Sequence, residues 1–551
     1  MHITVLVLSS LLWTACCQST SFDSREATID SVHHSLFSGL HSCRDVVSSF
    51  ISRIEATNSQ INAIITLNPA ALSIADDLDD ALSAGNATGA LFCIPVLLKD
   101  NYDTFDMPTT GASLALAGSQ PSVDGPAVAA LRRAGAVILG KANLHELALE
   151  GLSVSSLGGQ TINPYDSTRT PGGSSGGSGA AVAASFAVWA TGTDTVNSLR
   201  SPASANSLFS IRPTRGLISR AGVIPISYTQ DTIGPIARTV KDVAIALTVM
   251  ASVGFDPTDN ATALVPTSSI AVDYAASLTT GTLAGKRLGV LNGFYNRTVS
   301  NETTPVNEAM DALLSRLRAA GANLVPINET LYNATAIAAA LDTQRFEYRE
   351  LMDTYLSSPT LAGVHPTTLT SLYATNSTGS GGEFLVIPAE YEYVTTALRS
   401  STSNTTYATV QAGIRNLTLA LQATFSRNRL DAIVYPEQKN LVVKLGARSQ
   451  SGRNGILAAL TGFPVVTVPA GFSEATAEAP VGVPVGMEIL GRPWGERELL
   501  GLAWQVERVA RVRRAPVLAS GFVEAKVYRE VPMIMPNRRN VPAAYPVGTL
   551  G

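Results

Sequence analysis

Short apolar runs alternate with helix-like segments along most of the chain. "ALFCIPVLLKD" and "AVILG" are apolar runs of strand length, and the helix-like "DGPAVAALRRAG" lies between them. This helix should begin near Pro126 and end at Gly135. The alternation predicts an α/β fold: a single large domain with a mixed, mostly parallel central sheet covered by helices. A composition of 45% apolar and 15% charged residues suits a well-buried core of this kind.

The first 17 residues have the pattern of a secretory signal peptide. Met1 and His2 precede the apolar run "ITVLVLSSLLWTACC", which is too short to cross a bilayer, and Ala15 and Cys17 supply small residues for cleavage. The alternative is an uncleaved anchor or a buried first helix. We therefore expect a secreted, extracellular protein without a membrane span after cleavage. Its net charge of −4 offers no basic surface for nucleic acid.

Glycosylation sequons are concentrated in the middle of the chain. They lie at Asn86, Asn260, Asn296, Asn301, Asn328, Asn333, Asn376, Asn404 and Asn416. None falls between residues 87 and 259, as expected if that part is buried or must stay bare. The domain, residues 18–551, is expected to have its core at about 25–255 and 430–515. A helical, sequon-rich insertion at about 255–425 should set the choice of substrate.

Cys43 and Cys93 are the only cysteines after residue 17. In an oxidising compartment such a pair favours one disulfide, although two separate buried thiols fit the sequence equally well.

The Gly/Ser-rich stretch "TPGGSSGGSGAAVAAS" at 170–185 raises the question of catalysis. It lacks the Gly-Lys-Ser/Thr of a phosphate loop. It does contain G-x-S-x-G around Ser174, but only His365 follows that serine as a possible histidine base. A desolvated lysine could serve instead. Lys99, at the end of "CIPVLLK", and Lys141, in "VILGKAN", have similar apolar settings, and composition does not separate them.

A second serine follows the strand-like "FAVWATG", in "ATGTDTVNSLRSPAS". The backbone N–H groups at 195–198 lie in a turn of small or polar residues. Ser198 could attack a carbonyl there while these N–H groups hold the resulting oxyanion.

Several long blocks resemble the amidase signature family and occur in the family's order. They are "IPVLLKDNYDTFDMPTTGAS", "GAVILGKANLHELA", "NPYDSTRTPGGSSGGSGAAVAAS", "GTDTVNSLRSPAS", "YTQDTIGPIARTVKDVA", "LAALTGFPVVTVPAGF" and "VGMEILGRPWGERELLGLA". The resemblance covers most of the chain. It implies an amidase that acts on a small-molecule linear carboxamide without a metal or cofactor.

The resemblance also implies the roles of individual residues. Ser198 would be the nucleophile, Lys99 the base and Ser174 the proton relay between them, with the peptide from Gly173 to Ser174 in the cis form. Thr195, Val196, Asn197 and Ser198 would supply the backbone N–H groups of the oxyanion hole. Lys141, Ser175, Asp194 and Arg200 would support and order the site.

Two departures from the family pattern bear on this interpretation. Val196 and Asn197 replace two glycines that commonly precede the nucleophile, so their side chains should narrow the pocket. Cys93 stands where the family usually has glycine, which favours pairing with Cys43. The alternatives are an inactive binding protein with the amidase fold, or an esterase. The signal peptide and acidic charge argue against the family's transamidase role on charged transfer RNA, and the oligomeric state stays open.

Overall fold

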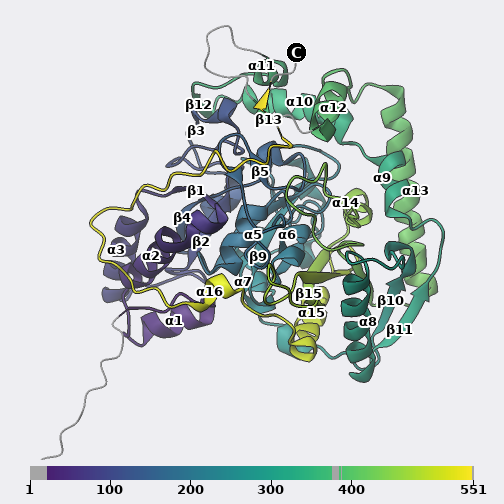
Figure 1. The fold of residues 1–551 in the computed structure, drawn as a ribbon, viewed down its shortest axis with the longest axis horizontal. Helices are drawn as coiled ribbons and strands as arrows, with labels where there is room; N and C mark the ends of the chain where they lie inside the picture. The colour runs from purple at the N-terminus through teal and green to yellow at the C-terminus, as the bar shows by residue number, and fades with distance from the viewer. Residues whose placement is uncertain (1–20, 375–383, 386–387, 546, 549–551) are drawn as a thin grey trace, which may run out of the picture.

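The structure is a computed structural model that describes residues 21–374, 384–385, 388–545 and 547–548 (Figure 1). The predicted signal peptide, 1–17, and the sequon at Asn376 lie outside these residues. Within the described part, no helix is long and apolar enough to span a membrane.

One sheet of 11 strands runs through the molecule. In spatial order it contains β1 (Ile64–Leu67), β4 (Val137–Ala142), β2 (Pro95–Lys99), β7 (Trp189–Asp194), β9 (Thr232–Ala237), β8 (Phe209–Arg212), β15 (Val465–Phe472), β16 (Pro484–Leu490), β14 (Ala432–Pro436), β10 (Arg287–Leu291) and β11 (Asn323–Ile327). Parallel pairs join β4, β2 and β7, and also β14, β10 and β11; the pairs between these groups are antiparallel. The predicted α/β class with a mixed central sheet is confirmed.

Helices cover this sheet in groups. They are α1 (Ile29–Phe37), α2 (Cys43–Ile61), α3 (Ala71–Ser83), α4 (Pro126–Arg133), α5 (Gly176–Ala183), α6 (Arg200–Ala205), α7 (Val240–Ala251), α8 (Thr304–Ala319), α9 (Ala334–Leu341), α10 (Gln344–Leu356), α11 (Leu369–Tyr373), α12 (Pro388–Leu398), α13 (Thr405–Arg427), α14 (Ile456–Thr461), α15 (Glu496–Ala510) and α16 (Val517–Ser520). α5 and α6 contact each other and the strands, and α15 packs on both α7 and α8. α10, α11 and α12 lie together at the top of Figure 1, with α9 and α13 at its right side.

Local sequence explains where the helices before the site begin and end. α2 starts after Ser42, whose Oγ accepts the N–H of Asp45 at 3.0 Å while Asp45 accepts the N–H of Ser42 at 2.9 Å. α4 begins at Pro126, as predicted, and Gly135 follows it with a φ of +85°.

The segment at 255–425 differs from the expected helical insertion. It does contain α8 to α13, but it also supplies β10 and β11, which form one end of the main sheet. These strands were missed because "RLGVL" and "NLVPI" are short apolar runs among Ser/Thr-rich and helical stretches. The segment is therefore part of the sheet as well as a cover over it.

Two features tie distant parts of the chain together. The predicted disulfide between Cys43 and Cys93 is present, with the Cα atoms 5.7 Å apart. It joins the start of α2 to the loop that leads into β2. The carboxyl-terminal segment runs back across the amino-terminal helices: buried Arg53 donates to the carbonyls of Ala519 at 3.0 Å and Gly521 at 2.9 Å.

Candidate active site

The Gly/Ser-rich loop approaches its neighbours too closely for side chains. A Cβ at Gly173 would lie 2.7 Å from Ser153 Oγ and 2.8 Å from the carbonyl carbon of Gly151. Gly172 has a φ of +70°, which favours glycine. The Gly173–Ser174 peptide is cis, and α5 begins two residues after Ser174. The glycines therefore let this loop lie deep inside the molecule, where Ser174 is fully buried.

Lys99, at the end of β2, contacts this loop directly. Its Nζ donates to Ser174 Oγ and to Thr193 Oγ1, both at 2.7 Å, and its side chain is fully buried. Burial lowers the pKa of Lys99 to about 7, although the charges of Asp194 and Asp231 oppose the shift. At neutral pH a large share of the Lys99 side chains is therefore neutral, and the neutral amine can accept a proton from the Ser174 hydroxyl.

Lys141, on β4, has a different set of partners. Its Nζ donates to the carbonyls of Tyr102 at 2.8 Å and Pro108 at 3.0 Å, and it lies 3.7 Å from a carboxylate oxygen of Asp100. It also donates to Thr109 Oγ1 at 3.0 Å. Because its partners are structural acceptors rather than a site hydroxyl, Lys141 has the surroundings of a structural cation. The two lysines that composition could not separate are separated by these contacts.

Ser198 lies in the turn after β7 and is 9% exposed. Its carbonyl accepts the N–H of Ser175 at 3.3 Å, which places the turn beside the Ser174 loop. Among the described residues, its hydroxyl has no hydrogen-bond partner. Ser198 lines a cavity of about 300 Å³, called here the Ser198 cavity, together with Val196 and residues of the 334–344, 390–393 and 439–456 segments.

The backbone of this turn presents unused donors. Within the described part of the chain, the N–H groups of Thr195, Val196, Asn197 and Ser198 have no acceptor. Leu199 is the first residue after them whose N–H is engaged; it donates to Asp194 Oδ2 at 3.0 Å. Four successive N–H groups are thus free to bind an oxyanion beside the Ser198 hydroxyl.

The side chains that replace the two common glycines leave in different directions. Asn197 is 1% exposed and donates to Glu437 Oε1 at 3.0 Å, so it is held in the interior. Val196 lines the Ser198 cavity and packs against a hydrophobic cluster that includes residues of α13 and α14. Of these two side chains, only Val196 takes space from the Ser198 cavity.

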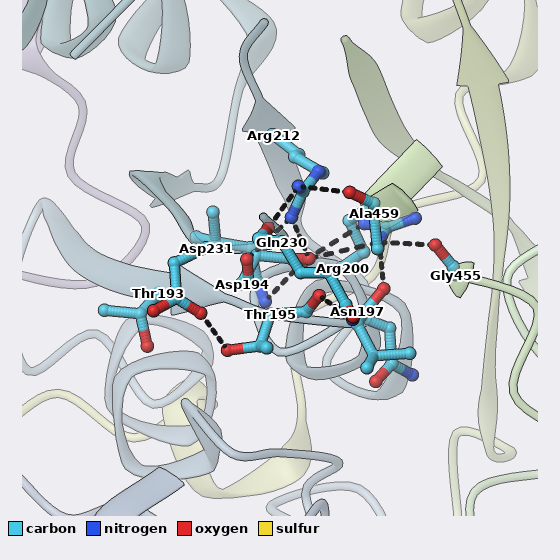
Figure 2. Close-up of polar contacts among 12 residues, drawn as sticks. Thr193, Asp194, Thr195, Asn197, Arg200, Arg212, Gln230, Asp231, Gly455 and Ala459 are labelled. Carbon is cyan, nitrogen blue, oxygen red and sulfur yellow. Dashed lines mark hydrogen bonds and ion pairs between the residues drawn. The ribbon is translucent and has the colours of Figure 1, made fainter. Parts of the chain in front are cut away.

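A buried ionic network holds the turn (Figure 2). Asp194 accepts from Arg200 Nε at 3.1 Å and from Arg212 Nη1 at 2.6 Å. Outside the view of Figure 2, Arg200 also donates to both carboxylate oxygens of Glu488, at 2.8 and 2.9 Å. Burial would raise the pKa of Asp194, but the two guanidinium groups outweigh it and hold that pKa at about 2. Arg200 also donates to the carbonyl of Val196. Asp194 and Arg200 thus connect β7, α6, β8 and β16 around the turn.

Several residues of the site were not singled out from the sequence. Thr193 binds the Lys99 amine, Asp231 accepts from Thr195 Oγ1 at 2.6 Å, and Gln230 donates to the Thr195 carbonyl at 3.3 Å. All three lie inside motifs already quoted, "GTDTVNS" and "YTQDTIG", which could have indicated them. Glu437 had no such signal, because it is 240 residues from Asn197.

Other predicted features lie as follows. Ser175 Oγ bridges the N–H and carbonyl of Thr193 at 3.3 Å. His365 contacts the carbonyls of Leu361 and Pro366, as a loop residue would. The described residues contain no group of three or more His, Cys, Asp or Glu placed to hold a metal ion.

Comparisons with known proteins agree with each other. The sequence model of the family described as "Amidase" matches residues 45–500. The chain is 33% identical over 512 residues to a probable amidase of Arabidopsis thaliana, across 90% of this chain and 93% of the relative. It is 32% identical over 518 residues to a glutamyl-tRNA(Gln) amidotransferase subunit from Geobacter sp. (strain M21), across 89% of this chain and 99% of the relative.

Solved structures give the same result. Native peptide amidase from Stenotrophomonas maltophilia matches with a TM-score of 0.76 at 33% identity, across 90% of this chain and 99% of that one. An amidase family protein from Bacillus anthracis str. Ames matches with a TM-score of 0.76 at 28% identity, across 89% and 92%.

Proposed function

The chain belongs to the amidase family, whose members act on carbon–nitrogen bonds, and we propose that it hydrolyses a linear carboxamide through an acyl-enzyme on Ser198. The observation that carries this proposal is the 2.7 Å hydrogen bond between the buried Lys99 amine and Ser174 Oγ. Through this bond, a base whose pKa suits proton transfer at neutral pH contacts the Ser174 hydroxyl, and the Ser174 loop lies beside the turn that carries the nucleophile.

In the first half of the reaction, neutral Lys99 takes the proton of Ser174 while Ser174 takes the proton of Ser198. The Ser198 oxygen attacks the amide carbonyl carbon, and the free N–H groups of 195–198 receive the developing oxyanion. The protonated relay then returns a proton to the leaving nitrogen. The C–N bond breaks, ammonia or an amine departs, and the acyl group remains on Ser198 as an ester.

In the second half, water attacks the ester carbonyl and loses its proton through the same relay. The tetrahedral intermediate collapses, the acid is released, and Ser198 regains its proton. Asn197 supports this cycle from outside the reacting atoms, because its bond to Glu437 fixes one end of the oxyanion turn.

A nucleophile test separates the amidase from the inactive binding protein and the esterase. We expect a folded sample to hydrolyse members of a panel of primary amides, anilides and fatty acyl amides, and a fluorophosphonate to add to Ser198 by mass spectrometry. Ser198→Ala should lower kcat/KM at least about a thousandfold. Ser426→Ala, at an exposed helical serine, is the matched control.

Three results would contradict the proposal. Amide hydrolysis that survives Ser198→Ala would reject the nucleophile. Hydrolysis of esters alone would indicate an esterase. A folded protein that neither turns over nor labels would be the inactive binding protein.

We also propose that the protein is exported and glycosylated. All eight sequon asparagines in the described residues are at least partly exposed, and Cys43 and Cys93 form a disulfide of the kind that oxidising compartments preserve. Expression in a eukaryotic secretory host should yield a secreted chain that begins near Gln18 and loses mass on treatment with an N-glycosidase. A chain that retains residues 1–17, or shows no mass change, would reject the corresponding part.

A further inference from the structure

The Ser198 cavity is lined by five charged side chains, and their partners differ. They are Glu150, Asp342, Glu390, Lys439 and Arg453. Arg453 donates to Glu150 at 3.3 Å, and Glu390 contacts the ring of His145. Each of these two carboxylates therefore already has a basic partner.

Asp342 is satisfied by hydrogen bonds instead. Its carboxylate accepts the Gln344 N–H at 3.1 Å and two contacts from the Gln344 amide nitrogen at 2.9 Å. Burial raises the pKa of Asp342, and the hydrogen bonds from Gln344 oppose that shift. Asp342 therefore lines the cavity without needing a basic partner.

Lys439 differs from the other four. It follows β14, lies half-buried on the cavity wall, and its ammonium group has no hydrogen-bond or ion-pair partner among the described residues. Burial lowers the pKa of Lys439, and no nearby carboxylate raises it back. Its backbone is held, because the Lys439 N–H donates to the carbonyl of Gly452 at 2.9 Å. The cavity wall therefore carries a cation that lacks a counterion among the described residues.

One uncharged residue of the cavity lining also favours a polar ligand. Gln450, 2% exposed, lines the same cavity, and its Oε1 has no partner among the described residues. A volume of about 300 Å³ is at the small end for ligand sites. A compact substrate with polar groups at both ends suits such a space better than a long acyl chain.

We propose that Lys439 binds a carboxylate of the substrate, so that the preferred amides are short monoamides of dicarboxylic acids. This inference rests on the proposed amidase function. The scissile carboxamide lies at Ser198, and the second carboxylate supplies the counterion that the Lys439 ammonium lacks. Lys439 is a specificity-determining residue in this arrangement and takes no part in the proton relay.

Paired substrates test the assignment. Glutaramate carries the carboxylate, and pentanamide carries a methyl group in its place. We expect the ratio of kcat/KM for glutaramate over pentanamide to fall about tenfold or more in Lys439→Met, because the charge is lost while the length of the side chain is kept. Lys439→Arg should retain most of the ratio, since it keeps the charge. Lys444→Met, at a lysine that lines a different cavity, should not change it.

A binding measurement keeps this inference separate from the amidase proposal. Glutarate should bind to Ser198→Ala by calorimetry, and adding Lys439→Met should weaken it about tenfold or more. Lys439-dependent glutarate binding without amide hydrolysis by the wild type would retain the carboxylate site and reject the amidase. Unchanged glutarate affinity, an unchanged ratio, or a ratio lost equally in Lys439→Arg would overturn the carboxylate assignment.

Discussion

Lys99 and Lys141 lie on neighbouring parallel strands, and both are fully buried, yet their partners give them different chemistry. Lys141 is bound by carbonyl groups and lies close to Asp100, which stabilises its charged form. Burial lowers the pKa of both lysines; the charge of Asp100 opposes it most at Lys141, whereas Lys99 has two hydroxyl partners and no carboxylate within ion-pair distance among the described residues. Because burial is common to both lysines, their partners are what distinguishes them.

The pH profile follows from this difference. kcat/KM for a neutral amide should rise as the pH is raised through about 7, because Lys99 must lose its proton before it can accept one from Ser174. Lys99→Met should lower kcat/KM by about 10²- to 10⁴-fold. Initial rates from pH 5.5 to 8.5 measure this limb. A flat profile over this range would reject Lys99 as the base.

Lys141→Met is the matched control for Lys99→Met. It leaves the Asp100 carboxylate buried without its cation, so the free energy of unfolding should fall by about 3–5 kcal/mol. In the fraction that stays folded, kcat/KM should rise with pH as it does in the wild type.

At the scale of the element, the turn after β7 is fixed by the helix that follows it and by two more distant segments. Thr195 is held by Asp231, Val196 by Arg200 and Asn197 by Glu437. The sequence motif predicted which residues form the turn. It could not predict where the Asn197 side chain goes, because its partner follows β14, far along the chain. Glycines would leave the backbone of this turn freer, whereas the anchored side chains hold it in place.

Removing this anchor tests its role. Asn197→Ala should lower kcat about tenfold with a smaller change in KM, because the oxyanion donors lose alignment when the Glu437 bond is gone. The lost bond should also cost about 1–3 kcal/mol of stability. Steady-state kinetics and denaturant unfolding measure the two effects. Asn307→Ala, at a residue of α8, removes one hydrogen bond to the Asn296 carbonyl and is the control. Equal losses of kcat in the two variants would contradict a role for Asn197 in positioning.

At the scale of the whole molecule, the alternating pattern predicted the fold class but not the order of the strands. Local patterns located β2, β4 and β7, because each is an apolar run with clear ends. They gave no information on which strands pair. β7 pairs with β9 and β8 with β15, and in each case other elements lie between the two strands in the sequence. The same limit hid β10 and β11, whose burial depends on neighbours far away in sequence.

The disulfide is a whole-molecule constraint, because it links α2 to the approach of β2 over a separation of 50 residues. Closing such a loop limits the unfolded chain, so Cys43→Ser with Cys93→Ser should lower the free energy of unfolding by about 2–5 kcal/mol. Denaturant unfolding with and without a reductant measures this. Reduced wild type should match the double variant; an unchanged midpoint on reduction would contradict the prediction.

The contacts of Arg53 have a consequence for synthesis. Its guanidinium is buried under the carboxyl-terminal segment and donates to the carbonyls of Ala519 and Gly521. Until residue 521 has been made, these two carbonyls are missing and the guanidinium is not covered by this segment, so the packing around Arg53 in α2 is still incomplete. One of the first helices to be translated therefore gains its last contacts from one of the last segments, so its final packing needs nearly the whole chain.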